Sequence, residues 1–359
     1  MASTSRWTIL NGVVGCNDHF INLNGRGTSR WCCGGLDLRR LQRTSDGTFF
    51  VTLPKAWVVR NKLEKGAILS FTERKDGKIL AEPYGEQERK IATVTLAPSP
   101  MLRREIEEKY LLGYDVFEIV SQQVIHSETR ETVRKIVRSL VGLEIVEEDT
   151  KKVVIQCLIE PSLLFPDRIL RRLHLITLSM HKDAVSSFVH GDSRLAHTVV
   201  ERDEDVDRLY FLLVRVVRAA LTDPAIAEKL GTSAIDCLDH RILASFVENF
   251  ADYATDIAES TWTRATGRDM DSTIRSIEKA GGILNRMHKD AVEAVFTRNL
   301  ALAEEATSLY KDAATSIRTA ERGLVNAKPE TIDRLATVVS ALKTMSEINV
   351  DIADLAVTR

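Results

Sequence analysis

Two pairs of acidic residues have a spacing that could bind a cation. Asp203 and Asp207 are four residues apart in "VVERDEDVDRLYFLLVRVV", and Glu248 and Asp252 are four apart in "VENFADYATDIAES". Residues at this spacing share one face of a helix, and in both segments that face borders an apolar stripe. Carboxylates beside an apolar surface repel one another and are costly to desolvate. On neighbouring helices, the two pairs would form an oxygen-rich cation site.

The same acids also fit a simpler explanation, which the spacing leaves open. Acidic residues four apart are common on solvated helix faces, where basic side chains pair with them. The candidate basic partners are Arg202, Arg208 and Lys182.

A repeated hexapeptide indicates which elements must position these acids. "MHKDAV" occurs at residues 180–185 and again at 287–292, an offset of 107 residues. The repeat predicts two related three-helix bundles, because the flanking segments also have helical periodicity. The predicted helices are 166–190, 191–221 and 235–262 in the first bundle (166–265), and 270–296, 298–327 and 329–357 in the second (266–359).

The second bundle does not repeat the acidic set. The positions that correspond to Asp203, Asp207, Glu248 and Asp252 are, in that order, Tyr310, Ala314, Lys343 and Glu347. Any metal ion is therefore expected in the first bundle alone. His181 and His288 occupy one equivalent position of the repeat, where packing is more typical of a helical histidine than metal ligation.

Composition and motifs exclude several classes of protein. The chain has 359 residues and a net charge of −2, so nucleic-acid binding would need a local basic patch. No apolar run is long enough for a membrane span, and the five cysteines form neither a disulfide framework nor a zinc set, which favours a reducing cytoplasm. The sequence contains no Glu-x-x-His, His-Glu-x-x-His, Gly-x-Ser-x-Gly or phosphate-binding glycine loop. We therefore predict no enzymatic activity and no organic cofactor.

Residues 36–90 have the pattern of a small β-rich unit. The order is strand, turn, strand, short helix, strand, turn and strand, with turn pairs at Asp46-Gly47 and Asp76-Gly77. Pro54 precedes the predicted helix, which runs from about Lys55 to Lys62. A unit this short buries little apolar surface, so we expect it to pair with a second copy.

This unit is also the most basic part of the chain. Residues 36–95 contain twelve Lys and Arg against eight Asp and Glu. Such local charge is what phosphate contacts need, and a dimer would double it. A solvated basic rim is the alternative explanation.

The remaining segments have weaker patterns. Residues 97–160 predict a small α/β connector, with helices at 102–112 and 128–141 and strands at 116–120, 144–146 and 151–160. Residues 1–35 show neither helical nor strand periodicity, which favours a disordered arm or a misassigned start codon.

Residues 37–84 resemble the SpoVT/AbrB-type swapped-hairpin DNA-binding domain. The resemblance rests on "LRRLQRT", "SDG", "VTLPKAW", "LEKG" and "DGKILAEP", in that order. It implies a dimeric swapped-hairpin β-barrel. The DNA contacts that it and the local charge favour are Arg39, Arg40, Arg43, Lys55, Arg60 and Lys62.

Residues from about 166 to 359 resemble the PhoU family of phosphate-uptake regulators, which are tandem three-helix bundles. The resemblance rests on "DSRLAHTVVERDEDVDRLYFLL" and "FVENFADYATDIAES", and "LVGLEIVEEDTKKVVIQ" is similar to the connector of archaeal proteins that join both domains. That family has Glu/Asp-x-x-x-Asp metal motifs, so the resemblance implies a divalent or ferric metal ion bound by Asp203, Asp207, Glu248 and Asp252.

Three functions remain open at this point. The first is a cytoplasmic homodimeric transcription regulator of phosphate uptake, which binds promoter DNA and uses the bundles as sensor or relay. The second is an adaptor that docks on a phosphate transporter or a sensor kinase, with the N-terminal barrel only dimerising. The third is a metal-carboxylate hydrolase or oxidase.

Overall fold

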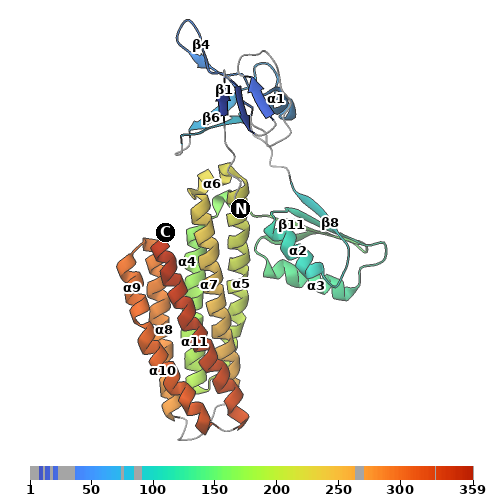
Figure 1. Ribbon diagram of the computed structural model, residues 1–359. Coiled ribbons are helices and arrows are strands. Elements are labelled where there is room, and N and C mark those ends of the chain that lie inside the picture. Colours follow the sequence, from blue (N-terminus) through green and yellow to red (C-terminus); the bar gives the residue numbers. More distant parts are fainter. Residues whose placement is uncertain are drawn as a thin grey trace. The chain divides into compact units, whose positions relative to one another are not determined.

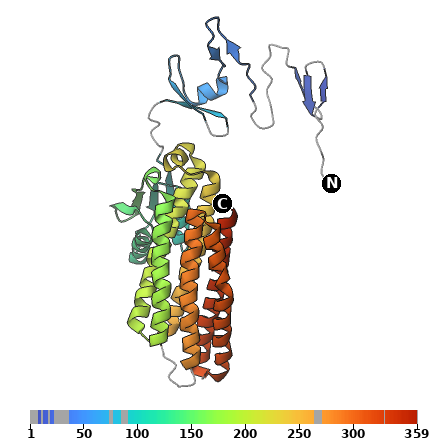
Figure 2. The same cartoon turned by 90° about the vertical axis from the view of Figure 1, so that its left-hand side faces the viewer.

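The chain folds into two compact units, Met1–Arg89 and Lys90–Arg359. This computed structural model describes residues 8–10, 13–16, 19–22, 37–73, 77–84, 91–262, 271–327 and 329–358 (Figures 1 and 2). Within these ranges, no helix is both long and apolar enough to cross a membrane.

The N-terminal unit contains the predicted succession of strands, turns and one helix. Its strands and helix are β4 (Gln42–Arg43), β5 (Phe49–Phe50), α1 (Lys55–Arg60), β6 (Leu69–Glu73) and β7 (Ile79–Pro83). β4 pairs with β5 and β6 with β7, both antiparallel. The turn residues Gly47 and Gly77 have positive φ, as the hairpin turns require. The helix ends before Lys62 because that residue has a φ of 53°, which ends the helical path.

Strands also occur where the sequence indicated none. β1 (Thr8–Leu10), β2 (Val13–Cys16) and β3 (His19–Asn22) form an antiparallel sheet in the order β1-β2-β3. The sequence pair Asn11-Gly12 between the first two strands is a hairpin signal, although the pair itself lies outside the described residues. The rest of residues 1–36 is also outside them, so the prediction of a disordered arm or misassigned start stays a prediction.

The described residues 37–73 and 77–84 of the N-terminal unit form no buried core. No described residue between 37 and 84 is buried, and α1 buries none of its side chains. Phe49, Phe71 and Ile79 are 61%, 63% and 69% exposed. Apolar side chains uncovered to this extent favour the prediction that the unit pairs with another copy. The swapped-hairpin barrel itself stays a prediction, because the described residues between 37 and 84 form two separate two-stranded sheets, β4-β5 and β6-β7.

The connector is a four-stranded sheet with two helices. Its elements are β8 (Thr93–Leu96), α2 (Leu102–Leu111), β9 (Val116–Val120), α3 (Ser127–Ser139), β10 (Leu143–Glu148) and β11 (Lys152–Cys157). The strand order is β10-β11-β9-β8, with β8 parallel to β9 and the other pairs antiparallel. The predicted connector began at residue 97 and therefore missed β8, an edge strand whose alternation is only four residues long.

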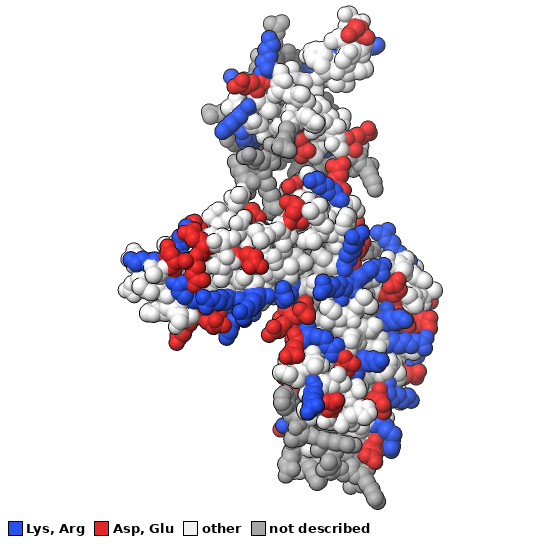
Figure 3. Space-filling model, turned by 180° about the vertical axis from the view of Figure 1, so that it is seen from behind, with Lys and Arg blue, Asp and Glu red and all other residues white. Residues whose placement is uncertain are grey.

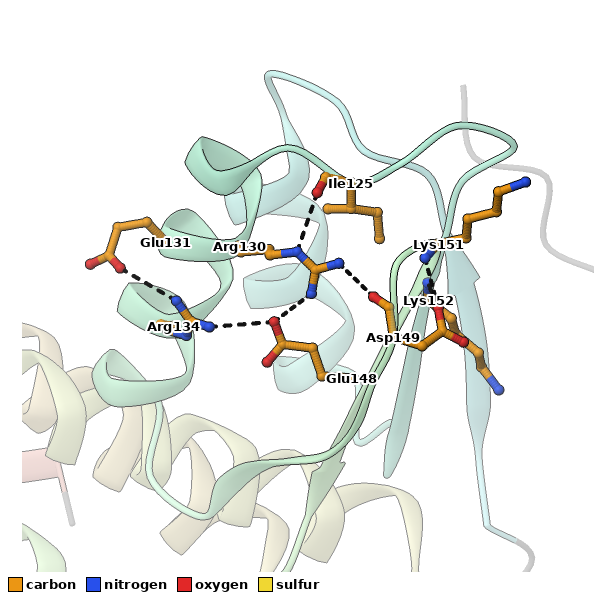
Figure 4. Close-up of polar contacts among 8 residues, drawn as sticks. All are labelled: Ile125, Arg130, Glu131, Arg134, Glu148, Asp149, Lys151 and Lys152. Carbon is orange, nitrogen blue, oxygen red and sulfur yellow. Dashed lines mark hydrogen bonds and ion pairs between the residues drawn. The ribbon is translucent and has the colours of Figure 1, made fainter.

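Arg130 ties the start of α3 to the β10–β11 turn (Figure 4). Its guanidinium donates to the carbonyl oxygens of Ile125, at 3.2 Å, and Asp149, and pairs with the Glu148 carboxylate. Asp149 Oδ1 accepts from the backbone N–H groups of Lys151 and Lys152 at 2.6 and 2.8 Å. The Arg130 side chain from α3 and the Asp149 side chain within the turn therefore both hold the β10–β11 turn in place.

The described part of the C-terminal region, residues 166–262, 271–327 and 329–358, contains helices and no strands, as predicted. Its helices are α4 (Pro166–His190), α5 (Ser193–Thr222), α6 (Pro224–Leu230), α7 (Ala234–Glu259), α8 (Asp271–Thr297), α9 (Leu300–Ser308), α10 (Tyr310–Gly323) and α11 (Pro329–Thr358). α4, α5 and α7 form one bundle, and α8 to α11 form the other. The bundles meet where α4 packs on α8 and α7 packs on α11 (Figure 1).

Two details differ from the predicted helices. The loop between the second and third helices contains α6, which starts at Pro224 under an Asp223 cap and ends at Gly231 with a φ of 64°. The predicted helix 298–327 is divided at Leu309. Thr307 and Ser308 donate their hydroxyls to carbonyl oxygens of the preceding turn.

The connector is fixed to the first bundle by a fully buried arginine. Arg215 of α5 donates from Nη1 to the carbonyl oxygens of Tyr110 and Tyr114, at 2.6 and 3.0 Å. Its Nη2 lies 3.3 Å from Asp115 Oδ1. Asp115 Oδ2 in turn accepts from the backbone N–H of Ala92, at 3.1 Å.

The repeated hexapeptide packs at the interface between the two bundles. His181 and His288 are completely buried, and their Nδ1 atoms lie 3.3 Å from Asn285 Oδ1 and 2.9 Å from Asn349 Oδ1. Phe250 stacks on His288 with ring centroids 3.9 Å apart. The repeated histidines are therefore packing residues.

Acidification should destabilise this buried histidine cluster. Burial lowers the pKa of both His174 and His181 to about 4, whereas the unfolded chain takes up these protons near pH 6.5. Stability from such a histidine is present above pH 6.5 and is lost as pH falls toward 4, by about 2 kcal/mol per histidine at pH 5.

Urea denaturation between about pH 7.5 and 5 should show this loss, and His174→Gln should reduce it relative to the wild type. The control is His197→Gln, at an exposed histidine on α5. Equal pH dependence in His174→Gln and the wild type would contradict the assignment.

Candidate metal centre

The four predicted metal ligands come from two adjacent helices. Asp203 and Asp207 lie on α5, and Glu248 and Asp252 lie on α7. Buried residues flank them on both helices, because the acidic positions border the stripes that pack the bundle. These neighbours include Val199, Val206, Val247 and Ala251.

The structure brings three of the four carboxylates to one point. Asp207, Glu248 and Asp252 each have a carboxylate oxygen within 4.8 Å of the others. Asp203 lies beside them, since its charge affects both Glu248 and Asp252. Its Oδ1 is buried and has no hydrogen-bond partner within the described part of the chain.

The alternative of a salt-bridged surface lacks its expected partners. Arg202 pairs with Asp183 at 2.7 Å, and Arg208 lies 3.7 Å from Asp205. Among the residues that the structure describes, no lysine or arginine forms an ion pair with any of the four acids. Their mutual repulsion is therefore not relieved by a paired side chain.

The pKa values of the four acids reflect this uncompensated charge. Burial, followed by the charge of Asp252, raises the pKa of Glu248 to about 7. Burial and neighbouring acids raise the pKa values of Asp203 and Asp252 to about 6, and burial also raises the pKa of Asp207. Without a cation, the cluster therefore binds protons close to neutral pH.

This donor set fits a hard metal ion. Every ligand is a carboxylate oxygen, which suits Mg²⁺, Mn²⁺ or an iron ion better than a soft metal. The buried Oδ1 of Asp203 makes no hydrogen bond of ordinary geometry, although the Thr255 hydroxyl lies near enough to this carboxyl to lower its pKa, and a coordinated ion or its water would be a stronger partner. The nearby Asp256 and Glu259 add negative charge around Asp203.

The second bundle has no equivalent. Tyr310 is the first residue of α10, and Lys343 introduces a positive charge on α11. Within the described ranges, no other group of three acidic, histidine or cysteine side chains has ligand atoms that converge in this way.

The six predicted DNA-contact residues all lie on the N-terminal unit and are exposed. Arg39 pairs with Asp37 at 2.8 Å. Arg43 of β4 lies over the Phe49 ring, 5.5 Å from its centroid. Lys55 and Arg60 begin and end α1.

The sequence analysis did not identify the connector residues whose charges act on the acidic cluster. Arg103 and Glu107 of α2 both influence the pKa of Asp207. The signal for Arg215 was present, since it is a lone arginine in the apolar run "FLLVRVV".

Removing one carboxylate should stabilise the metal-free protein and weaken metal binding. Glu248→Gln removes a group whose raised pKa costs stability as pH rises through about 7. With an allowance for solvent screening, we expect a gain of about 1 kcal/mol in unfolding free energy near pH 8 in EDTA. Added MnCl₂ should stabilise the wild type more than this variant.

The matched control is Glu347→Gln, at the corresponding exposed position of the second bundle. It should change neither the metal-free stability nor the response to Mn²⁺. An equal Mn²⁺ response in Glu248→Gln and the wild type would exclude Glu248 as a ligand.

Comparison with known proteins identifies two domains. The PhoU domain model matches residues 170–261, and the model described as "Antidote-toxin recognition MazE, bacterial antitoxin" matches residues 42–88. Both are non-enzymatic regulatory domains. A search of curated proteins found no match.

Two solved structures are similar to the helical region. PhoU from Pseudomonas aeruginosa is 18% identical, with a TM-score of 0.40, and the match covers 54% of this chain and 93% of that one. The phosphate transport system regulatory protein PhoU from Streptococcus pneumoniae is 11% identical, with a TM-score of 0.46, covering 54% of this chain and 91% of that one. By the two matched models alone, the chain contains a PhoU domain at residues 170–261 and a MazE/AbrB-like domain at residues 42–88.

Proposed function

We propose that this chain is a cytoplasmic, DNA-binding transcription regulator of phosphate uptake. The observation that carries the proposal is the combination of the two matched domains in one chain. The PhoU domain links the chain to phosphate homeostasis, and the MazE/AbrB-like domain is of a DNA-binding type. The bundles act as the sensor or relay, and the N-terminal unit is the output.

The N-terminal unit dimerises as a swapped-hairpin barrel. Support comes from the lack of buried residues among its described residues 37–73 and 77–84, and from its exposed apolar side chains on β5, β6 and β7. A second copy would cover these side chains and supply the hydrophobic burial that one copy lacks. Dimerisation would also bring the basic residues of both copies together in one dimer.

DNA binding rests on the exposed basic residues of this unit. Arg40 and Arg43 belong to the basic first strand, and Lys55, Arg60 and Lys62 belong to α1 and its end. Basic side chains bind phosphates by releasing condensed counterions, which makes affinity fall steeply with salt.

The acidic centre binds a divalent or ferric ion. Its role is structural or regulatory, in keeping with the regulatory domains whose models match the chain. Occupancy would cancel the repulsion between α5 and α7 and so fix their relative positions.

The test is a salt titration of binding to DNA from upstream of the organism's own phosphate-transport genes, beside scrambled DNA of equal length. Reversing two charges in Arg40→Glu/Arg43→Glu should weaken binding by about tenfold or more at moderate salt. The control is Lys135→Glu/Arg138→Glu, an equal charge change at exposed positions of α3.

We expect the wild type to prefer its own DNA, and the control to bind like the wild type. Sedimentation equilibrium on the same samples should show a dimer. If neither the wild type nor the control binds DNA at low salt, the barrel only dimerises. The bundles would then dock as an adaptor on a phosphate transporter or a sensor kinase.

A further inference from the structure

A cavity of about 240 Å³ lies where the two helical bundles meet. The first turns of α4 and α7, the end of α6, the last turn of α8 and the segment after it surround the cavity. His240 of its wall is eight residues from Glu248 on α7, about 12 Å along the helix, so the cavity is separate from the acidic centre. Its lining includes two aromatic rings, two carboxylates, an imidazole and a guanidinium, from Phe165, Phe296, Asp167, Asp236, His240 and Arg298.

Arg298 occupies a backbone position that suits glycine. Its φ is 53°, and the backbone N–H of Asn299 donates to the carbonyl oxygen of Ala294 at 3.1 Å, as at helix ends that usually carry glycine. The repeat offset of 107 residues places Arg298 opposite Gly191, which ends α4 with a φ of 69°. A side chain in this conformation is unfavourable. An arginine where the other copy of the repeat has glycine therefore points to a function for its side chain.

The Arg298 guanidinium lies at the mouth of the cavity. Its side chain is 63% exposed, and its Nη2 lies 3.5 Å from Asp236 Oδ1 across the interface between the bundles. Asp236 is fixed from its other side, because its Oδ2 accepts from the backbone N–H and the hydroxyl of Ser233 at 3.0 and 2.7 Å. A guanidinium has five N–H groups, so this one contact leaves Arg298 with donors for a ligand.

His240 forms the base of the cavity and Asp167 reaches its mouth. The His240 side chain is 4% exposed and its Nε2 lies 2.7 Å from Asp167 Oδ1, whereas the Asp167 side chain is 64% exposed. An ionised carboxylate only accepts hydrogen bonds, so His240 Nε2–H donates to Asp167. This hydrogen bond holds a second carboxylate at the cavity.

Positive charge surrounds the two carboxylates. The guanidinium carbon of Arg168 lies 5.0 Å from the centroid of the Phe165 ring, and that of Arg171 lies 4.2 Å from the centroid of the Phe296 ring. The N-terminal ends of α4 and α7 add the positive ends of their helix dipoles. Figure 3 shows basic side chains gathered at the upper end of the helical region. The cavity therefore attracts an anion, although two carboxylates line it.

The two carboxylates restrict which anion can bind. A fully ionised anion such as sulfate only accepts hydrogen bonds, so Asp167 and Asp236 repel it. An oxyanion that keeps an O–H group can donate to a carboxylate while its other oxygens accept from the planar Arg298 guanidinium. Hydrogen phosphate keeps such a proton at neutral pH, and a small phosphate monoester can carry hydroxyl groups on its organic part.

We propose that this cavity binds phosphate, either as free hydrogen phosphate or as the phosphate group of a small hydroxylated monoester. Arg298 binds the oxyanion, and Asp167 or Asp236 accepts from its hydroxyl group. The choice of phosphate among protonated oxyanions rests on the proposed function, in which the bundles act as sensor. Because Arg298 follows α8 while both carboxylates belong to the first bundle, the ligand joins the two bundles.

The test is calorimetric titration of the full chain with sodium phosphate and with sodium sulfate, at equal ionic strength and in EDTA to keep metal ions from the acidic centre. The wild type should bind phosphate at least about tenfold more tightly than sulfate. Arg298→Gly should weaken phosphate binding by about tenfold or more, because charge-assisted hydrogen bonds are lost. Its melting temperature should stay close to that of the wild type, because glycine accepts the positive φ.

Two further variants separate selectivity from general charge. Asp167→Asn should reduce the preference for phosphate over sulfate by about tenfold, because it removes a charge that repels a fully ionised anion. Arg172→Gln is the control, since Arg172 is exposed on α4 and does not line the cavity. It should change phosphate affinity by less than about twofold.

Glycerol phosphate is titrated beside inorganic phosphate to separate the two sources of the phosphate group. Tighter binding of glycerol phosphate assigns the cavity to a monoester, and tighter binding of inorganic phosphate assigns it to the free ion.

Three results would overturn the proposal. These are no binding of either phosphate compound by the wild type, equal affinity for phosphate and sulfate, and equal phosphate affinity in Arg298→Gly and the wild type. The DNA-binding proposal survives all three, because its salt titration reports on the N-terminal unit. Phosphate binding by a wild type that shows no DNA preference would instead overturn the transcription role and support the cavity site.

Discussion

The buried guanidinium of Arg215 is the contact on which the arrangement of the C-terminal unit depends. Placing a charged group in the interior is costly unless hydrogen bonds compensate it. Two carbonyl oxygens at the end of α2 and the Asp115 carboxylate supply this compensation, and the Tyr110 ring lies 4.9 Å from the guanidinium carbon. The carbonyl end of a helix also attracts positive charge. The connector consequently has one favoured position on the first bundle.

The charges of the acidic centre, by contrast, are not compensated by paired side chains. Arg215 is buried with its charge compensated, whereas the acids on α5 and α7 are partly buried with theirs uncompensated. Such a cluster can be neutralised by protons, by a cation or by a neighbouring basic residue. The pKa of Glu248, raised to about 7, means that protons neutralise part of the cluster close to neutral pH, where they would compete with any bound cation. Because one stripe of α5 holds both Asp207 and Arg215, the geometry of the connector and the charge of the centre are linked.

Much of the fold could be predicted from the sequence, because local signals agree with the tertiary structure. The hairpin glycines, the helix after Pro54 and the duplicated bundles all depend on short-range chemistry or on periodicity. The four acids were likewise found by spacing alone, because helix neighbours at four residues stay together in any packing.

The structural features that the sequence did not predict have a different origin. β8 is too short to show a pattern, and the helical periodicity of residues 298–327 continues across the break at Leu309, so it gave no sign of that break. The effect of the Arg103 charge on the pKa of Asp207 could not be predicted, since it depends on how the connector docks on α5, which periodicity does not encode. Arg215 did leave a sequence signal, but its partners lie about one hundred residues away in the chain.

The two bundles differ in charge because different faces are constrained in each. The repeated hexapeptide lies where α4 meets α8, so each copy packs against the other bundle. The helices approach so closely that a Cβ on Gly281 would lie 2.7 Å from Val185 Cγ1. A change there would disturb both bundles at once. The acidic positions instead lie between α5 and α7, within one bundle, and their counterparts Tyr310 and Lys343 are free to differ. A shared interface therefore explains why MHKDAV occurs twice, and a site confined to one bundle explains why the acids occur once.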